Sequence, residues 1–181
     1  MTTQVVRPRT WDARLIAEVG VTMALAGVLH WFRLWEMPQG GSINLGSMVP
    51  IFILALRRGP RVGFLAGALY GILEGWILDG GKYFYHPVQV ILDYPLAFGL
   101  LGLAGFFPKM PAFGVVIGSL ARYASHVISG IVFFGQYAKG QPVMLYSLGY
   151  NAVYLGPNLL ISIALTLLVW ERLSRLQPAN T

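Results

Sequence analysis

The sequence predicts an all-α integral membrane protein, a bundle of six transmembrane helices, and three observations support this. Of its 181 residues, 56% are hydrophobic and only 11% are charged, whereas soluble domains usually carry about 25% charged residues. Short polar segments rich in Gly and Pro divide the chain into six apolar runs. Six spans of roughly 20 residues take about 120 positions, which leaves only loops and tails within one membrane domain, residues 1–181.

Turn-forming residues lie at both ends of each apolar run, and they set the limits of each expected span. The first run follows a basic N-terminus without a small-residue cleavage site, so we expect a retained span rather than a signal peptide. The second run is short, which favours a helix that is tilted or partly buried by its neighbours. The expected spans are residues 13–34, 43–56, 62–78, 87–107, 113–134 and 143–169.

The third expected span carries a glycine at every fourth position. Gly63, Gly67, Gly71 and Gly75 therefore lie along one face of a helix. Small residues on such a face let another helix approach closely, which replaces the hydrophobic driving force that lipid removes. We therefore expect this face to pack against a neighbouring span.

Lys and Arg residues are distributed unequally between the two sides of the expected bundle. On one side lie nine, Arg7, Arg9, Arg14, Arg57, Arg58, Arg61, Lys109, Arg172 and Arg175; on the other lie three, Arg33, Lys82 and Lys139. Positive charge accumulates on the cytoplasmic side of membrane proteins, so we expect both termini in the cytoplasm. The net charge of +6 then reflects topology, and no nucleic-acid partner is expected.

Ionisable residues within the expected spans are costly and mark functional candidates. They are Glu18, Glu74, Asp93, Arg122 and His126. Arg122 and His126 are four residues apart and share one helix face, which Gly130 and Phe134 continue. Asp93 either forms a structural pair with Arg122 or faces a cationic or hydrogen-bonding ligand.

Aromatic residues gather toward the outer side, and they meet Asp93, His126 and Asn151 if the last three spans pack together. An interfacial belt explains many of them, yet aromatic faces beside a carboxylate also suit a flat, positively charged heterocycle. The chain has no cysteine, no Walker A motif and three scattered histidines. We therefore expect a small-molecule pocket with no catalytic residues, no metal site and no cofactor.

Several ordered segments strengthen this expectation. They are GGSINLGSMVP (40–50), HPVQ (86–89), LDYPLAF (92–98), RYxxH (122–126), FGQYA (134–138) and YSLxxN (146–151). In order and spacing they resemble the ThiT (YuaJ) family, the thiamine-binding S components of energy-coupling factor (ECF) transporters. The resemblance implies a six-helix membrane fold with an outward-facing vitamin pocket, in the plasma membrane of a prokaryote.

The resemblance also implies roles for individual residues. Asp93 and Asn151 would hold the aminopyrimidine of thiamine, while His126 and Phe134 would flank the thiazolium. Family members carry Trp where this chain has Phe134, so stacking is kept and the cation–π attraction is weaker. Segment 34–42 would act as a lid. The other pocket-lining matches are Tyr83, Tyr94, Gly130, Gln136 and Tyr146.

The partners that the resemblance implies are a transmembrane coupling subunit and two cytoplasmic ATPase subunits. Family members contact the coupling subunit through a small-xxx-small pattern on the first helix, which Gly20 and Ala24 match; ordinary packing within the bundle is the alternative. Three other functions stay open: an S component for another vitamin or a thiamine precursor, an intramembrane enzyme using Asp93 and His126, and a non-binding scaffold.

Overall fold

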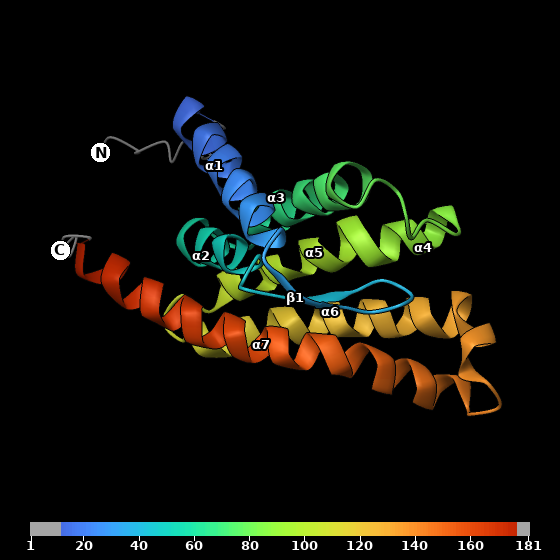
Figure 1. Ribbon diagram of the computed structural model, residues 1–181. Helices are drawn as coiled ribbons and strands as arrows, with labels where there is room; N and C mark the ends of the chain where they lie inside the picture. Colours follow the sequence, from blue (N-terminus) through green and yellow to red (C-terminus); the bar gives the residue numbers. More distant parts are fainter. Residues whose placement is uncertain (1–11, 177–181) are drawn as a thin grey trace, which may run out of the picture.

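The computed structural model describes residues 12–176, which form a bundle of helices capped by a small hairpin (Figure 1). Its elements are α1 (Ala13–His30), β1 (Arg33–Glu36), β2 (Ser42–Asn44), α2 (Val49–Arg58), α3 (Pro60–Leu73), the π-helical turn η1 (Glu74–Leu78), α4 (Pro87–Ile91), the π-helical turn η2 (Leu92–Leu96), α5 (Ala97–Gly99), the 3₁₀ segment η3 (Leu100–Phe106), α6 (Pro111–Phe133), the 3₁₀ turn η4 (Gly135–Ala138) and α7 (Val143–Leu176). Arg7 and Arg9, which enter the charge count, lie outside the described residues.

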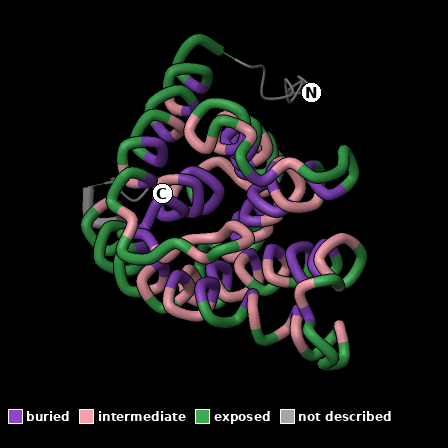
Figure 2. The backbone as a smooth tube through the Cα atoms, turned by 45° about the vertical axis from the view of Figure 1, so that its right-hand side comes forward, coloured by how far each residue is buried: buried purple, intermediate pink, exposed green. Residues whose placement is uncertain are grey.

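Five helical segments are long and apolar enough to cross a membrane, which confirms the prediction of a helical membrane bundle. They are Ala13–His30, Pro60–Leu78, Pro87–Phe106, Pro111–Phe133 and Val143–Leu173. Large apolar side chains on the outside of the bundle are exposed, as on α1, where Ile16, Val21, Leu25 and Val28 are 52–59% exposed. Figure 2 shows the buried residues toward the interior and exposed residues around them. An apolar exterior is the arrangement that lipid favours.

The segment between the first two helices differs from the expectation. Residues 33–44 form an antiparallel hairpin in which Glu36 pairs with Ser42, so the expected first span ends early, at His30. Gly40 and Gly41 turn the chain with φ of 94° and 87°, a conformation that favours glycine. Residues 43–48, expected to begin the second span, belong instead to β2 and a turn.

The second helix is consequently short. α2 has ten residues, which reach only about 15 Å, against a hydrocarbon core of about 30 Å. Its residues Ile51, Phe52 and Ala55 are fully buried, because α1, α3, α6 and α7 pack around it. It is therefore largely an interior helix, on which Pro50 and Ile53 stay partly exposed.

The glycine face of α3 packs as expected. A Cβ added at Gly67 would lie 2.1 Å from the Phe98 carbonyl oxygen, and one added at Gly71 would lie 2.4 Å from the Tyr94 carbonyl oxygen. At Gly63 it would lie 2.5 Å from the Ala55 Cβ. The close helix approach predicted from the glycine spacing is confirmed, and it sets α3 directly against the helix that carries Asp93.

Two widened helical turns each hold a carboxylate. Glu74 begins η1, and Asp93 lies in η2, which also contains Pro95. Proline has no N–H group and so interrupts the regular hydrogen-bond pattern of a helix. Such π-helical turns are rare and are frequent at functional sites.

Candidate functional site

A pocket lies beneath the hairpin, between the helix Pro87–Phe106, α6 and α7. Its charged lining residues are Arg33, Glu36, Glu74, Asp79, Asp93 and Arg122. Four carboxylates against two guanidinium groups make the lining acidic. The free volume of the pocket is about 80 Å³.

Most of the residues predicted from the sequence meet here. Eight line the pocket: Tyr83, Asp93, Tyr94, His126, Gly130, Phe134, Tyr146 and Asn151. Gln136 does not, because α6 ends at Phe133 and the chain turns into η4, where Gln136 is exposed.

Three donors hold the Asp93 carboxylate. Gln89 Nε2 donates to Asp93 Oδ2 at 2.6 Å, and Ser129 Oγ donates to the same oxygen at 2.8 Å. His126 Nδ1 lies 3.0 Å from Asp93 Oδ1. Gln89 sits one helical turn before Asp93, whereas the other two come from α6. The carboxylate is thus fixed between two helices, with one edge in the pocket.

Arg122 determines the tautomer of His126. An arginine side chain only donates hydrogen bonds, and Arg122 Nε lies 3.2 Å from His126 Nε2. His126 Nε2 is therefore the acceptor, and Nδ1 carries the proton that is donated to Asp93. The guanidinium lies 3.9 Å from the Phe98 ring centroid. The direct Asp93–Arg122 pair weighed from the sequence is not formed, because the imidazole stands between them.

Asn151 ties α7 to the wall formed by α6. Its Nδ2 donates to the His126 carbonyl oxygen on α6 at 3.4 Å. Within α7, Nδ2 also donates to the Ser147 carbonyl oxygen at 2.9 Å, and Oδ1 accepts from the Tyr154 hydroxyl at 2.9 Å. A Cβ added at Gly130 would lie 2.1 Å from Ser147 Oγ. Gly130 therefore permits the close approach of α6 and α7 on which the position of Asn151 depends.

An aromatic wall runs along α7. The ring centroids of Tyr146 and Tyr150 are 5.8 Å apart, and those of Tyr150 and Tyr154 are 6.3 Å apart. Phe134 faces this wall from the end of α6, with the Tyr85 ring 5.3 Å away at its edge. Sequence reasoning named Tyr146 alone, although the i, i+4, i+8 spacing of the three tyrosines is a signal that could have found the others.

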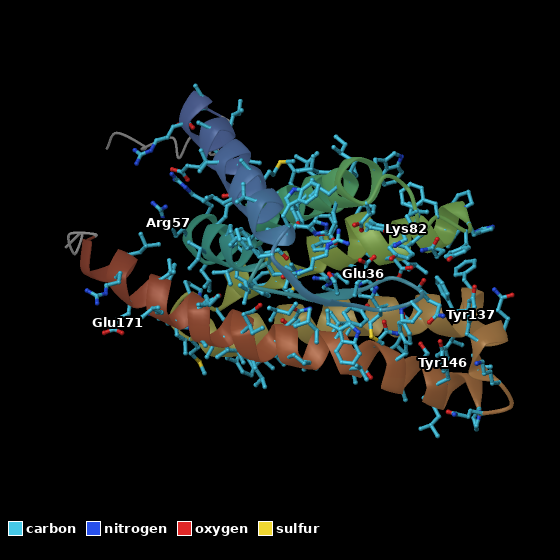
Figure 3. All side chains as sticks on the ribbon, viewed as in Figure 1. Glu36, Arg57, Lys82, Tyr137, Tyr146 and Glu171 are labelled. Carbon is cyan, nitrogen blue, oxygen red and sulfur yellow. The ribbon has the colours of Figure 1, made fainter. Side chains whose placement is uncertain are left out.

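Two sets of contacts hold the hairpin over the pocket. The Tyr150 hydroxyl accepts from the Gln39 backbone N–H at 2.9 Å and donates to the Gly40 carbonyl oxygen at 3.0 Å. Glu36 accepts from Lys82 Nζ at 3.0 Å and from the Tyr83 hydroxyl; Figure 3 labels Glu36 and Lys82 at this junction. These bonds from Tyr83 and Lys82 hold the pKa of the Glu36 carboxyl below its usual range. Glu36 is therefore ionised at neutral pH.

An ionic cluster closes the pocket at the end of α1, and the sequence did not predict it. His30, which is 2% exposed, has Nδ1 3.4 Å from Glu74 Oε2 and Nε2 3.3 Å from Asp79 Oδ1. Arg33 pairs with the same Asp79 carboxylate. Only Glu74 had been flagged, as an ionisable group at membrane depth. Nowhere in residues 12–176 do three or more His, Asp or Glu side chains form a set that could hold a metal ion.

Gly20 and Ala24 lie on α1, away from this pocket. Both are exposed, and no heavy atom of the described residues lies within 4 Å of a Cβ added at Gly20. Gly20 therefore makes no close packing contact with the other described helices, which was the alternative weighed for it.

Known proteins resemble this chain over most of its length. The family model described as "Thiamine transporter protein (Thia_YuaJ)" matches residues 16–177. The thiamine transporter ThiT of Bacillus subtilis is 41% identical over 92% of this chain and 95% of that protein. ThiT of Lacticaseibacillus paracasei is 36% identical over 86% of this chain and 84% of that protein. A solved structure of ThiT from Listeria monocytogenes superposes with a TM-score of 0.79 and 29% identity, covering 91% of this chain and 98% of that one.

Proposed function

The chain belongs to the thiamine transporter (Thia_YuaJ) family, and on this premise we propose that it is the S component of an ECF-type importer, binding thiamine from the extracellular side. It is a multi-pass membrane protein that binds and releases its ligand without bond chemistry. The observation that carries the proposal is the Asp93 carboxylate, fixed between helices beside an aromatic wall in an acidic pocket.

Asp93 and Asn151 are the proposed partners of the aminopyrimidine. Asp93 accepts from Gln89, Ser129 and His126, but two carboxylate oxygens offer about four acceptor sites, so one stays open to a ligand N–H. The Asn151 Oδ1 atom accepts one bond from Tyr154, and its second lone pair is open. Two fixed acceptors suit the amino group of a pyrimidine.

His126, Phe134 and Tyr146 are the proposed partners of the thiazolium. The acidic lining favours a ligand with a permanent positive charge, and aromatic faces attract such a cation. Phe134 supplies a weaker face than Trp, so affinity depends more strongly on the carboxylates. Glu36 and the hairpin would close behind the bound ligand.

Calorimetry with the purified protein and thiamine tests this proposal directly. We expect saturable binding of one thiamine per chain, and no heat of binding at micromolar thiamine would overturn it. Competition separates the other vitamins: riboflavin or biotin in excess should leave thiamine binding unchanged. Stronger displacement by the isolated aminopyrimidine than by thiamine itself would favour a thiamine precursor as the ligand.

The proposed partners are a transmembrane coupling subunit and two cytoplasmic ATPases. The face of α1 that carries Gly20 and Ala24 is exposed, and small residues allow another helix to approach closely. This face is our candidate for contact with the coupling subunit. The start of α1 and the end of α7 lie on the same side of the bundle (Figure 1), in keeping with a shared cytoplasmic location.

A further inference from the structure

A second hollow, separate from the thiamine pocket, opens on the outside of the bundle. It is a groove between α1, α2 and α7 with a volume of about 650 Å³, which is within the ~300–1,000 Å³ range typical of small-molecule sites. Its lining is apolar over most of its length and includes Val21 and Leu25 from α1, Ile53 from α2, and Leu165 and Val169 from α7. None of these residues lines the thiamine pocket.

Cationic side chains stand at one end of the groove. Arg14 and Arg57 line it together with Glu18. Glu18 is already engaged, since Arg58 Nε donates to it at 2.6 Å and Arg14 lies 3.4 Å away. No described side chain forms an ion pair with Arg57, which Figure 3 labels between α1 and α7. The charged lining residues are thus two arginines and one glutamate, which leave this end of the groove positively charged.

The groove follows most of the length of the first membrane-spanning helix. Along α1 it runs from Arg14 to Leu29, which at 1.5 Å per residue is about 22 Å. Its charged end belongs to the side that the distribution of Lys and Arg places in the cytoplasm. The groove therefore matches the two parts of a phospholipid. Its cationic end in the interface suits the phosphate headgroup, and its apolar channel leading into the hydrocarbon region suits the acyl chains.

We propose that the groove binds one anionic phospholipid of the inner leaflet. Its phosphate would lie between Arg57 and Arg14, because guanidinium groups bind phosphate oxygens in a planar, bidentate manner. One acyl chain would lie along Val21 and Leu25. A zwitterionic lipid carries the same phosphate, but its own cationic group offsets the negative charge of that phosphate and so weakens its attraction to Arg57.

Native mass spectrometry of the purified protein tests the proposal. The protein in mild detergent is mixed with equal amounts of phosphatidylglycerol and phosphatidylcholine that have the same acyl chains. We expect one retained phosphatidylglycerol, favoured roughly tenfold over phosphatidylcholine. Arg57→Gln should abolish this preference, whereas Arg61→Gln, which removes a nearby exposed arginine outside the groove, should keep it.

A second pair of variants tests the apolar part of the groove. Leu25→Trp adds bulk to the channel and should prevent retention, while Leu69→Trp on α3, outside the groove, should not. Thiamine binding should be unchanged in all four variants, which shows that each is folded. Equal retention of both lipids would overturn the anionic assignment. Lipid retained in Leu25→Trp, or none retained by the unaltered protein, would overturn the lipid site and leave the groove for a protein helix.

Discussion

At the scale of single residues, Asp93 illustrates how a carboxylate is kept at membrane depth. Gln89 donates from the preceding helical turn, while Ser129 and His126 donate from α6. Buried polar groups are costly unless they are hydrogen-bonded, and these three donors satisfy the carboxyl group of Asp93. The same donors aim its remaining acceptor sites at the pocket.

Asp93→Ala should weaken thiamine binding by at least about 2 kcal/mol, the cost typical of truncating a buried charged hydrogen bond, or roughly 30-fold in Kd. Calorimetry measures the loss, and thermal unfolding shows whether the variant is folded. An affinity equal to that of the unaltered protein would remove Asp93 from the site.

Phe134→Trp should strengthen thiamine binding, because the indole face attracts a cation more strongly than a phenyl ring, by about 0.5–1 kcal/mol at such a site. Phe133→Trp is the matched control, since Phe133 stacks on His86 and does not line the pocket. Dissociation constants measured by calorimetry separate the two. Equal effects of both variants would place the thiazolium elsewhere.

At the scale of elements, the hairpin Arg33–Asn44 covers the pocket, and its attachments come from distant helices. Tyr150 on α7 binds the hairpin turn, while Glu36 in β1 meets Lys82 and Tyr83 after η1. The hairpin thus joins the α7 wall to the η1 turn across the mouth of the pocket. Its closure follows from a few polar contacts, which can break and re-form.

Tyr150→Phe removes both hydrogen bonds between α7 and the hairpin turn. At about 1 kcal/mol for a net hydrogen bond, we expect thiamine to dissociate roughly fivefold faster. Stopped-flow tryptophan fluorescence measures this rate. Tyr123→Phe is the control, because its hydroxyl bonds to the Leu148 carbonyl oxygen outside the pocket. An unchanged rate in Tyr150→Phe would mean that these bonds do not hold the lid.

Helix α1 offers an element-scale test of the partner surface. Ala24→Leu places bulk on the exposed face proposed to meet the coupling subunit, where close helix approach needs small side chains. Co-purification with the coupling subunit should fall roughly tenfold, a loss of about 1.4 kcal/mol, while thiamine binding stays intact. Ala124→Leu, on the exposed face of α6, is the matched control. Undiminished co-purification of Ala24→Leu would exclude this face.

At the scale of the whole molecule, the bundle depends on backbone contact between α3 and the helix that carries Asp93. Gly63, Gly67 and Gly71 allow this contact, and a bulkier residue would push the two helices apart. Because that helix also positions Asp93 and Tyr94, the stability of the fold and the shape of the pocket depend on the same interface.

Gly67→Ala should destabilise the protein by at least about 2 kcal/mol, since overpacking costs roughly 1–3 kcal/mol and the clash here is with a carbonyl oxygen. Thermal unfolding in detergent measures the change. Gly20→Ala is the matched control: it has open space around it and should be neutral or slightly stabilising. Similar melting temperatures for the two variants would contradict the assigned packing.

The sequence by itself determined the helical membrane bundle, the glycine contact face and most of the candidate site. Hydropathy marks spans because lipid offers no hydrogen bonds to an exposed backbone, and a four-residue spacing marks a helix face whatever the fold. Asp93 and His126 were recognisable as ionisable residues within apolar runs, while the roles of Asp93, His126 and Asn151 came from ordered motifs that resemble a family. Patterns of this kind depend only on residues that are close together in the sequence.

Only the tertiary structure decided the hairpin over the pocket, the burial of α2 and the ionic cluster around His30. Arg33 and Asp79 are 46 positions apart, and Gln39 and Tyr150 are 111 apart, so no periodicity relates them. Their meeting depends on which helices pack together, as α6 packs against α7 and as α3 packs against the helix that carries Asp93. The groove between α1, α2 and α7 likewise exists only because a ten-residue helix lies between two longer ones.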